Sequence, residues 1–350
     1  MNCIFTLLLL SLSCGDAFDN QLNENSDNFT SRTFSANDSL QCQQEANADA
    51  RDCLEGLAWR STDFSVVLEK PDKQSGDRLV RFPSPRPVGN ATNDLVAMEW
   101  YIAADVSGKI KVAPAVVVVH ESGRNMTVGR IIAKGFRAKG MHAFLLQLPG
   151  YGARRVPLPD EATRMLPALR QGIADTRRAY DAVAALPWVR KDRIALQGTS
   201  LGGFVTATVA GLDDSYDRIF ILLAGGNLHE VVLHGAKDAA KARQKLEAAG
   251  VTEEQIIKMA RVVEPLRVAH RLQPEKVWLF SGTNDDVVPP SCSLALASAA
   301  ALPVDHHIQL PADHYSGAIF LPIIIQQMVH CIESDLESGT PAIQPSSGIR

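Results

Sequence analysis

The chain has 350 residues, of which 46% are hydrophobic, and its formal net charge is −4. This length and composition are typical of one large globular α/β domain. The mild negative charge gives no electrostatic basis for binding nucleic acid, and no uninterrupted apolar run is long enough to predict a membrane span.

The first residues predict export. Residues 4–12 form an apolar run that is too short to cross a bilayer but has the length of a signal-peptide core. We therefore expect residues 1–17 to be a signal peptide and the protein to be secreted or periplasmic. Lipid attachment at Cys14 is the less favoured alternative. Residues 18–62 are rich in Asn, Asp, Ser and Gln, which predicts a polar, largely disordered leader.

Cysteine usage fits an oxidising compartment. Removal of the signal peptide would leave Cys42, Cys53, Cys292 and Cys331. This even number permits two disulfide bridges. No Cys-x-x-Cys pair and no His/Cys spacing typical of metal ligands occurs, so we expect no metal site.

Strand-like and helix-like segments alternate from residue 115 onward. Apolar strands are expected at 116–120, 142–147, 193–197, 218–224, 277–281 and 306–310, and helices at 128–139, 169–186 and 201–211. Uniformly apolar strands are typical of a parallel sheet covered on both faces. The chain therefore predicts an α/β fold with a doubly wound, mostly parallel sheet, preceded by edge strands at 78–82 and 95–102.

Residues 225–275 interrupt this alternation. Amphipathic helices are expected at 237–249 and 252–263, and Thr252 and Gln255 have the spacing of a capping box. An insertion at this point lies over the carboxyl ends of the strands, so we expect a small helical cap; a surface excursion is the alternative. The main domain is then expected over 63–336, with a flexible tail at 337–350.

Gly198-Thr199-Ser200-Leu201-Gly202 is the most informative motif in the chain. This Gly-x-Ser-x-Gly run stands between an expected strand and an expected helix. That context is typical of a nucleophile elbow, a turn so sharp that glycine is needed on both sides of the serine. The alternative is a glycine-rich turn that only packs a helix closely on the sheet.

An acid and a histidine follow in loops after later strands. Asp285 and Asp286 come after the strand at 277–281, and His314 comes after the last strand. A serine hydroxyl needs a base within hydrogen-bond reach, and the base needs an acid to orient it. We therefore expect Ser200, His314 and an aspartate to form a catalytic triad, although turn or capping roles are alternatives for the aspartates.

On these motifs the chain resembles the α/β-hydrolase superfamily, whose catalytic residues follow in the order Ser, Asp, His. The resemblance covers about 77–335 and includes the motif around Ser200, Gly282-x-x-Asp285 and Asp313-His314. The acidic residue in His120-Glu121-Ser122-Gly123 is similar to the dienelactone-hydrolase and acetyl-esterase branch, which borders the prolyl-oligopeptidase catalytic domain. The family pattern implies Asp285 rather than Asp286 as the acid, and it implies no cofactor.

Backbone N–H groups should stabilise the tetrahedral intermediate. We expect these oxyanion donors to be Leu201, which follows the nucleophile, and Ser122, in the loop after the first parallel strand. Glu121 stands beside this site, where a carboxylate opposes developing negative charge. It must point away, be paired with an arginine such as Arg124, or take part in the mechanism.

A second loop offers candidate substrate contacts. Tyr151, Arg154 and Arg155 follow the strand at 142–147, at the sheet edge where ligands bind in open α/β folds. Tyr151 could pack on substrate, and the two arginines could hold an anionic group or neutralise Glu121. Solvent-facing loop charges are the alternative for both arginines.

The sequence therefore predicts a serine hydrolase that acts on small-molecule carboxylic esters. Short acyl groups are favoured because the expected cap is charged and alanine-rich rather than broadly apolar. A serine exopeptidase of the acylaminoacyl type is the first alternative, disfavoured because no β-propeller is recognised before the catalytic region. A catalytically silent binding member of the fold is the second, disfavoured by the complete set of triad residues.

Overall fold

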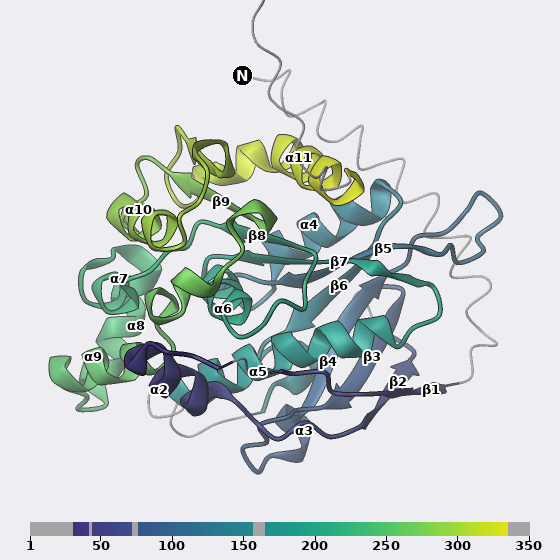
Figure 1. Ribbon diagram of the computed structural model, residues 1–350, viewed down its shortest axis with the longest axis horizontal. Coiled ribbons are helices and arrows are strands. Elements are labelled where there is room, and N and C mark those ends of the chain that lie inside the picture. Colours follow the sequence, from purple (N-terminus) through teal and green to yellow (C-terminus); the bar gives the residue numbers. More distant parts are fainter. Residues whose placement is uncertain (1–30, 42–43, 72–75, 157–164, 335–350) are drawn as a thin grey trace, which may run out of the picture.

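The computed structural model describes residues 31–41, 44–71, 76–156 and 165–334. The expected signal peptide, the first part of the expected leader and the expected tail at 337–350 lie outside these residues. Within them, ten strands form one sheet in the order β1-β2-β3-β4-β6-β5-β7-β8-β9-β10 (Figure 1). The strands are β1 (Arg32–Ala36), β2 (Phe64–Glu69), β3 (Arg78–Pro83), β4 (Leu95–Tyr101), β5 (Ala113–Val119), β6 (His142–Gln147), β7 (Val189–Thr199), β8 (Arg218–Leu222), β9 (Val277–Gly282) and β10 (His307–Leu310).

The sheet has an antiparallel edge and a parallel body. Strands β1 to β4 pair antiparallel with one another, and β4 pairs antiparallel with β6. From β6 through β10 every neighbouring pair is parallel. The predicted doubly wound, mostly parallel sheet is therefore confirmed, and the carboxyl ends of its parallel strands meet at one edge, where a site is expected.

Helices cover both faces of this sheet (Figure 1). The α-helices of the described residues, those of the cap included, are α2 (Ala48–Leu57), α3 (Ala91–Asp94), α4 (Thr127–Ala138), α5 (Met165–Ala184), α6 (Leu201–Ala210), α7 (Leu228–His234), α8 (Lys237–Ala248), α9 (Glu253–Val262), α10 (Pro290–Ala299) and α11 (Leu321–Glu333). Strand β5 shows why its sequence is uniformly apolar. Val117 and Val119 pack in the core with α5 and α6, whereas Val116 and Val118 pack on the opposite face with α4 and α11.

The C-terminal helix is a core element. Ser316–Glu333, which includes α11, is long and apolar enough to cross a membrane by length and composition alone. Its residues Leu321, Ile324, Met328 and Ile332 are buried in the core against α4 and the sheet. This burial accounts for the apolar residues on one face of the helix, whereas Ile323 on the other face is exposed.

The expected leader is part of the fold over residues 31–41 and 44–62, so the prediction of disorder is wrong for these residues. Strand β1 extends the sheet by pairing with β2, with Phe34 opposite Val66. Helix α2 begins after Asn47, whose side-chain oxygen accepts hydrogen bonds from two amides of the first turn. The helix buries Cys53, Leu54 and Leu57. This apolar face outweighs the polar composition of the segment.

Acidic side chains then tie the α2 region to residues far along the chain. Glu45 pairs with Arg271 at 2.8 Å, and Asp52 pairs with Arg267 at 2.6 Å. Asp49 pairs with Arg267 at 2.9 Å. Because both arginines follow α9, the last helix of the inserted segment, the N-terminal segment fastens the base of this insertion to the body of the domain.

The predicted insertion is a small cap of three helices, α7, α8 and α9, which pack on one another around Leu246 and Ile256. The capping box at the start of α9 is present, with Thr252 as the N-cap and Gln255 as its partner. The expected disulfides are not found among the described cysteines. Cys53, Cys292 and Cys331 are buried free thiols, and Cys42 lies outside the described residues.

Candidate active site

Ser200 occupies a strained turn between β7 and α6. Its φ of 52° and ψ of −114° are uncommon for a residue with a side chain. A Cβ atom on Gly198 would lie 2.2 Å from the Gly202 carbonyl oxygen, and one on Gly202 would lie 2.2 Å from the Val119 carbonyl oxygen. Both flanking glycines are therefore required by backbone contact, as the expected nucleophile elbow demands.

The structure brings Ser200, His314 and Asp285 into one hydrogen-bonded chain. The Oγ atom of Ser200 lies 2.9 Å from Nε2 of His314, and Nδ1 of His314 lies 2.7 Å from Oδ2 of Asp285. Because the carboxylate accepts at Nδ1, the network assigns the proton to that nitrogen and leaves Nε2 free to accept from the serine. His314 can therefore act as the base for Ser200.

Backbone amides hold the Asp285 carboxylate in place. Its Oδ1 atom accepts hydrogen bonds from the N–H groups of Val287 at 2.9 Å and Val288 at 2.8 Å. Both oxygens are thus occupied, one by the backbone and one by His314. Since Asp285 and His314 are both buried, this arrangement excludes water from the ion pair that they form when His314 is protonated.

The other candidate acid and histidines lie elsewhere. Asp286 is exposed, pairs with Lys237 at 2.9 Å, and accepts the Ala236 N–H through its carbonyl oxygen, so it joins the acid loop to the cap. His307 is hydrogen-bonded to Ser281, and His306 donates to backbone carbonyls. Of the two aspartates on this loop, only Asp285 contacts His314.

The two candidate oxyanion donors lie at the same end of neighbouring strands. Strands β5 and β7 are parallel, with Val119 beside Gly198, and Ser122 and Leu201 each follow three residues later. Leu201 begins α6, and the first amides of a helix have no partner within it and carry its positive end. The Ser122 carbonyl accepts a hydrogen bond from the Tyr151 hydroxyl at 3.0 Å, which fixes the orientation of that loop.

Glu121 is accounted for by helix capping rather than by an arginine. Its two carboxylate oxygens accept hydrogen bonds from the N–H groups of Val128 and Gly129, each at 3.1 Å, in the first turn of α4. The positive end of the helix offsets the carboxylate charge. Of the alternatives for Glu121, pairing with Arg124, Arg154 or Arg155 is not the one that the structure shows, because backbone N–H groups hold the carboxylate.

Arg154 does not reach a substrate. It is completely buried, and its guanidinium forms an ion pair with Asp175 at 2.7 Å while donating to the carbonyl oxygens of Asn93 and Gln147. Both interpretations of Arg154, holding an anionic group and facing solvent, are therefore wrong, because the guanidinium is buried and its donors are used inside the protein. Arg155 is exposed, as its alternative interpretation expected.

His120 is a site residue that the sequence reasoning did not single out. It is buried and lies between two loops, with Nδ1 2.5 Å from the Glu121 carbonyl oxygen and Nε2 3.1 Å from the Leu148 nitrogen. Burial lowers the pKa of His120 to about 4, so it is neutral near pH 7, with Nδ1 donating and Nε2 accepting. Tyr151 packs against its ring. In the sequence, the position of His120 directly before Glu121 was the signal that could have identified it.

Comparison with known proteins agrees with this geometry. The profile of the prolyl oligopeptidase family, Peptidase_S9, matches residues 169–317, which include all three residues of the hydrogen-bonded chain. No curated protein sequence matches significantly.

Among solved structures, the chain is similar to acetyl xylan esterases from Paenibacillus sp. R4 and Thermoanaerobacterium sp. JW/SL YS485. The first has 17% identity, a TM-score of 0.55 and coverage of 84% of this chain and 96% of that one. The second has 14% identity, a TM-score of 0.52 and coverage of 85% and 97%. A puromycin-hydrolysing peptidase from Mycobacterium tuberculosis has 16% identity and a TM-score of 0.54, with coverage of 81% of this chain but 47% of that one.

Proposed function

We propose that this chain, a serine hydrolase of the α/β-hydrolase superfamily, cleaves carboxylic esters that carry short acyl groups. The observation that carries the proposal is the continuous chain from the Ser200 hydroxyl through His314 to Asp285, with contacts of 2.9 and 2.7 Å. A nucleophile, its base and the group that orients the base are thus assembled in one hydrogen-bonded triad.

The reaction follows from the hydrogen-bond directions. His314 Nε2 takes the Ser200 proton as Oγ attacks the ester carbonyl carbon, and Asp285 stabilises the resulting imidazolium. The N–H groups of Leu201 and Ser122 stabilise the oxyanion, and each such donor is worth about 3–4 kcal/mol of barrier. The imidazolium then gives its proton to the departing alcohol, which leaves an acyl group on Oγ. Water, activated by His314, releases the acid and restores the serine.

Polar residues of the cap support the preference for short acyl groups. Tyr315, next to His314, donates to Asp238 of the cap at 2.9 Å, and Lys237 lies 5.0 Å from the Tyr315 ring centroid. An apolar groove would reward each added methylene with about 0.8 kcal/mol, and this part of the cap offers charged groups instead. The similarity to two acetyl xylan esterases, each covered almost along its full length, supports the same choice.

A serine peptidase is the second candidate. It is favoured by the match of residues 169–317 to the prolyl oligopeptidase family and by the structural similarity to the puromycin-hydrolysing peptidase. The triad serves amide and ester hydrolysis alike, so substrate preference must decide between them.

The test is a kinetic comparison on purified protein. Turnover of p-nitrophenyl esters from acetate to octanoate is measured beside aminoacyl p-nitroanilides, with Ser200→Ala as the control. We expect kcat/KM to be highest for acetyl to butyryl esters and to fall by octanoyl. Ser200→Ala should lose activity by a factor on the order of 10⁶ and should no longer react with a fluorophosphonate probe. Faster cleavage of the anilides would favour the peptidase, and a best rate at octanoyl would refute the short-acyl preference.

A further inference from the structure

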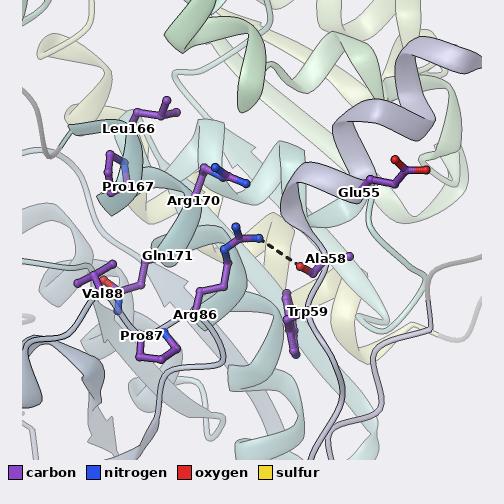
Figure 2. Close-up of a pocket in the computed structure, with 10 residues that line it drawn as sticks. All are labelled: Glu55, Ala58, Trp59, Arg86, Pro87, Val88, Leu166, Pro167, Arg170 and Gln171. Atoms are coloured by element: carbon purple, nitrogen blue, oxygen red, sulfur yellow. Dashed lines mark hydrogen bonds between the residues drawn. The ribbon is translucent and has the colours of Figure 1, made fainter.

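An open pocket of about 450 Å³ lies between α2, the loop after β3 and the start of α5 (Figure 2). Its lining includes Trp59, Arg86, Val88, Leu166, Arg170 and Gln171. None of the residues that line it belongs to the triad or to the oxyanion loop. The volume lies in the range of natural small-molecule sites.

Two arginines in this pocket converge on one carbonyl oxygen. Nη1 of Arg86 donates to the Gly56 oxygen at 3.0 Å and to the Ala58 oxygen at 3.2 Å, and Nη2 of Arg170 donates to the same Gly56 oxygen. Burial and the neighbouring Arg170 charge lower the pKa of Arg86. Each guanidinium carries five N–H donors, so these contacts leave most of them for another acceptor. The Nε atom of Arg170 is buried and has no partner within the described residues.

The two arginines of the pocket differ from several buried arginines, which form ion pairs with acids. Arg154, Arg177 and Arg178 each form an ion pair of 2.9 Å or less with an aspartate. Across the residues that the structure describes, neither arginine of the pocket forms an ion pair with an acid. Glu55 also lines the pocket, but in Figure 2 its carboxylate points away from both guanidiniums. Partly buried cations normally have a counter-ion, and the described part of the chain supplies none to these two arginines.

Apolar side chains provide most of the remaining lining. Trp59, Val88 and Leu166 surround the two guanidiniums together with Pro87 and Pro167 (Figure 2). A small inorganic anion would contact few of these groups and would leave most of the volume unfilled. The lining is suited to a molecule with one anionic end and an apolar body.

We propose that this pocket binds a small organic carboxylate, whose carboxylate group lies between Arg86 and Arg170 and whose apolar body packs on Trp59, Val88 and Leu166. The planar guanidinium fork matches the two oxygens of a carboxylate. An aromatic face beside it can accept a flat apolar group. The site is separate from the catalytic residues, so the proposal does not depend on ester hydrolysis.

The first experiment tests whether binding requires both the negative charge and the apolar body of the ligand. Isothermal titration calorimetry on the full-length Ser200→Ala protein compares 3-phenylpropionate, the neutral 3-phenylpropionamide, acetate and inorganic phosphate. Charge-assisted hydrogen bonds predict that 3-phenylpropionate binds roughly 10- to 100-fold more tightly than the amide, and the apolar lining predicts that acetate and phosphate bind more weakly. The proposal is overturned if 3-phenylpropionate shows no binding at 10 mM, or if the amide or phosphate binds equally well.

The second experiment places the binding in this pocket. Val88→Asp places a carboxylate of the protein beside the two arginines and should reduce the affinity for 3-phenylpropionate at least about 10-fold. Val88→Asn introduces a side chain of the same shape as aspartate but without its charge, so it should not reduce the affinity. Arg170→Gln should weaken binding similarly, whereas Arg60→Gln, at an exposed arginine outside the lining, should not. Gln171 is left unchanged because it is hydrogen-bonded to Asn93. Circular dichroism checks that each variant is folded.

Two outcomes of this series would overturn the proposal. The first is unchanged affinity in both Val88→Asp and Arg170→Gln, which would locate the ligand elsewhere. The second concerns Asp160 and Glu161, which lie outside the described residues but close in sequence to Leu166. The series therefore includes the double variant Asp160→Asn, Glu161→Gln, and binding that appears only in this variant would show that acids of the chain itself fill the site.

Discussion

Changing Asp285 to Asn should disable the enzyme through the histidine tautomer. In the native protein Oδ1 of Asp285 accepts from the Val287 and Val288 amides, and Oδ2 accepts from His314. An asparagine must keep its oxygen toward the two amide donors, so its NH₂ group faces Nδ1 of His314. The imidazole would then carry its proton on Nε2, where it could not take the Ser200 proton.

The size of the effect follows from this geometry and from a control on the same loop. By analogy with the serine-protease triad, the wrong tautomer lowers kcat by about 10⁴, which corresponds to about 5.5 kcal/mol of barrier. Asp286→Asn removes only an exposed pair with Lys237. Such pairs contribute about 0.2–1 kcal/mol, so its kcat/KM should change by no more than about fivefold.

The assay is p-nitrophenyl acetate hydrolysis, with the protein concentration of each variant measured by absorbance and folding checked by thermal unfolding. Both variants should unfold cooperatively, and only Asp285→Asn should be inactive. The reasoning is refuted if Asp286→Asn is the inactive variant, or if Asp285→Asn keeps more than about a hundredth of the native rate.

The other predictions concern the groups that support the site. Arg154→Met should destabilise the protein by about 3–5 kcal/mol in urea unfolding, because it leaves the buried Asp175 carboxylate unpaired; an unchanged stability with a higher KM for anionic esters would contradict this. Burial lowers the pKa of His120 to about 4 in the folded protein, so as the pH falls this histidine is protonated in the unfolded chain before it is protonated in the folded one. The free energy of unfolding should therefore fall as the pH drops from about 6.5 to 4. That fall should be smaller in His120→Gln. Glu121→Ala should lower kcat more than Glu121→Gln, whose amide oxygen can still accept one α4 amide hydrogen bond, and equal losses would argue against the capping role. Tyr151→Phe should lower kcat about fivefold with little change in KM, because one hydrogen bond to the oxyanion loop is lost; a change confined to KM would instead indicate direct substrate contact.

The sequence was most informative where a local pattern has one structural solution. The glycines around Ser200 are required by backbone contacts of 2.2 Å, so the motif identified the turn. Strand β5 is apolar on both faces because helices cover both. Thr252 and Gln255 formed the capping box that their spacing predicts.

Prediction failed where composition was read without periodicity, or where a charge was assigned a role without its partners. The segment before residue 62 is polar, yet Ala50, Cys53, Leu54 and Leu57 recur at helical spacing and are buried. Arg154 stands in a loop beside the site, but its partner Asp175 is on α5. Sequence order does not reveal such a pairing, because it depends on how the elements pack.

The ion pairs between the N-terminal segment and the base of the cap also govern when the protein can complete its fold during synthesis. Glu45 and Arg271 are separated by 226 residues. At a ribosomal rate of about 5–20 residues per second, Arg271 is made roughly 10–45 s after Glu45. During that interval Glu45, Asp49 and Asp52 lack their arginine partners Arg267 and Arg271. The segment around α2 therefore stays without these contacts, and accessible to chaperones, proteases and targeting factors, until the last quarter of the protein emerges.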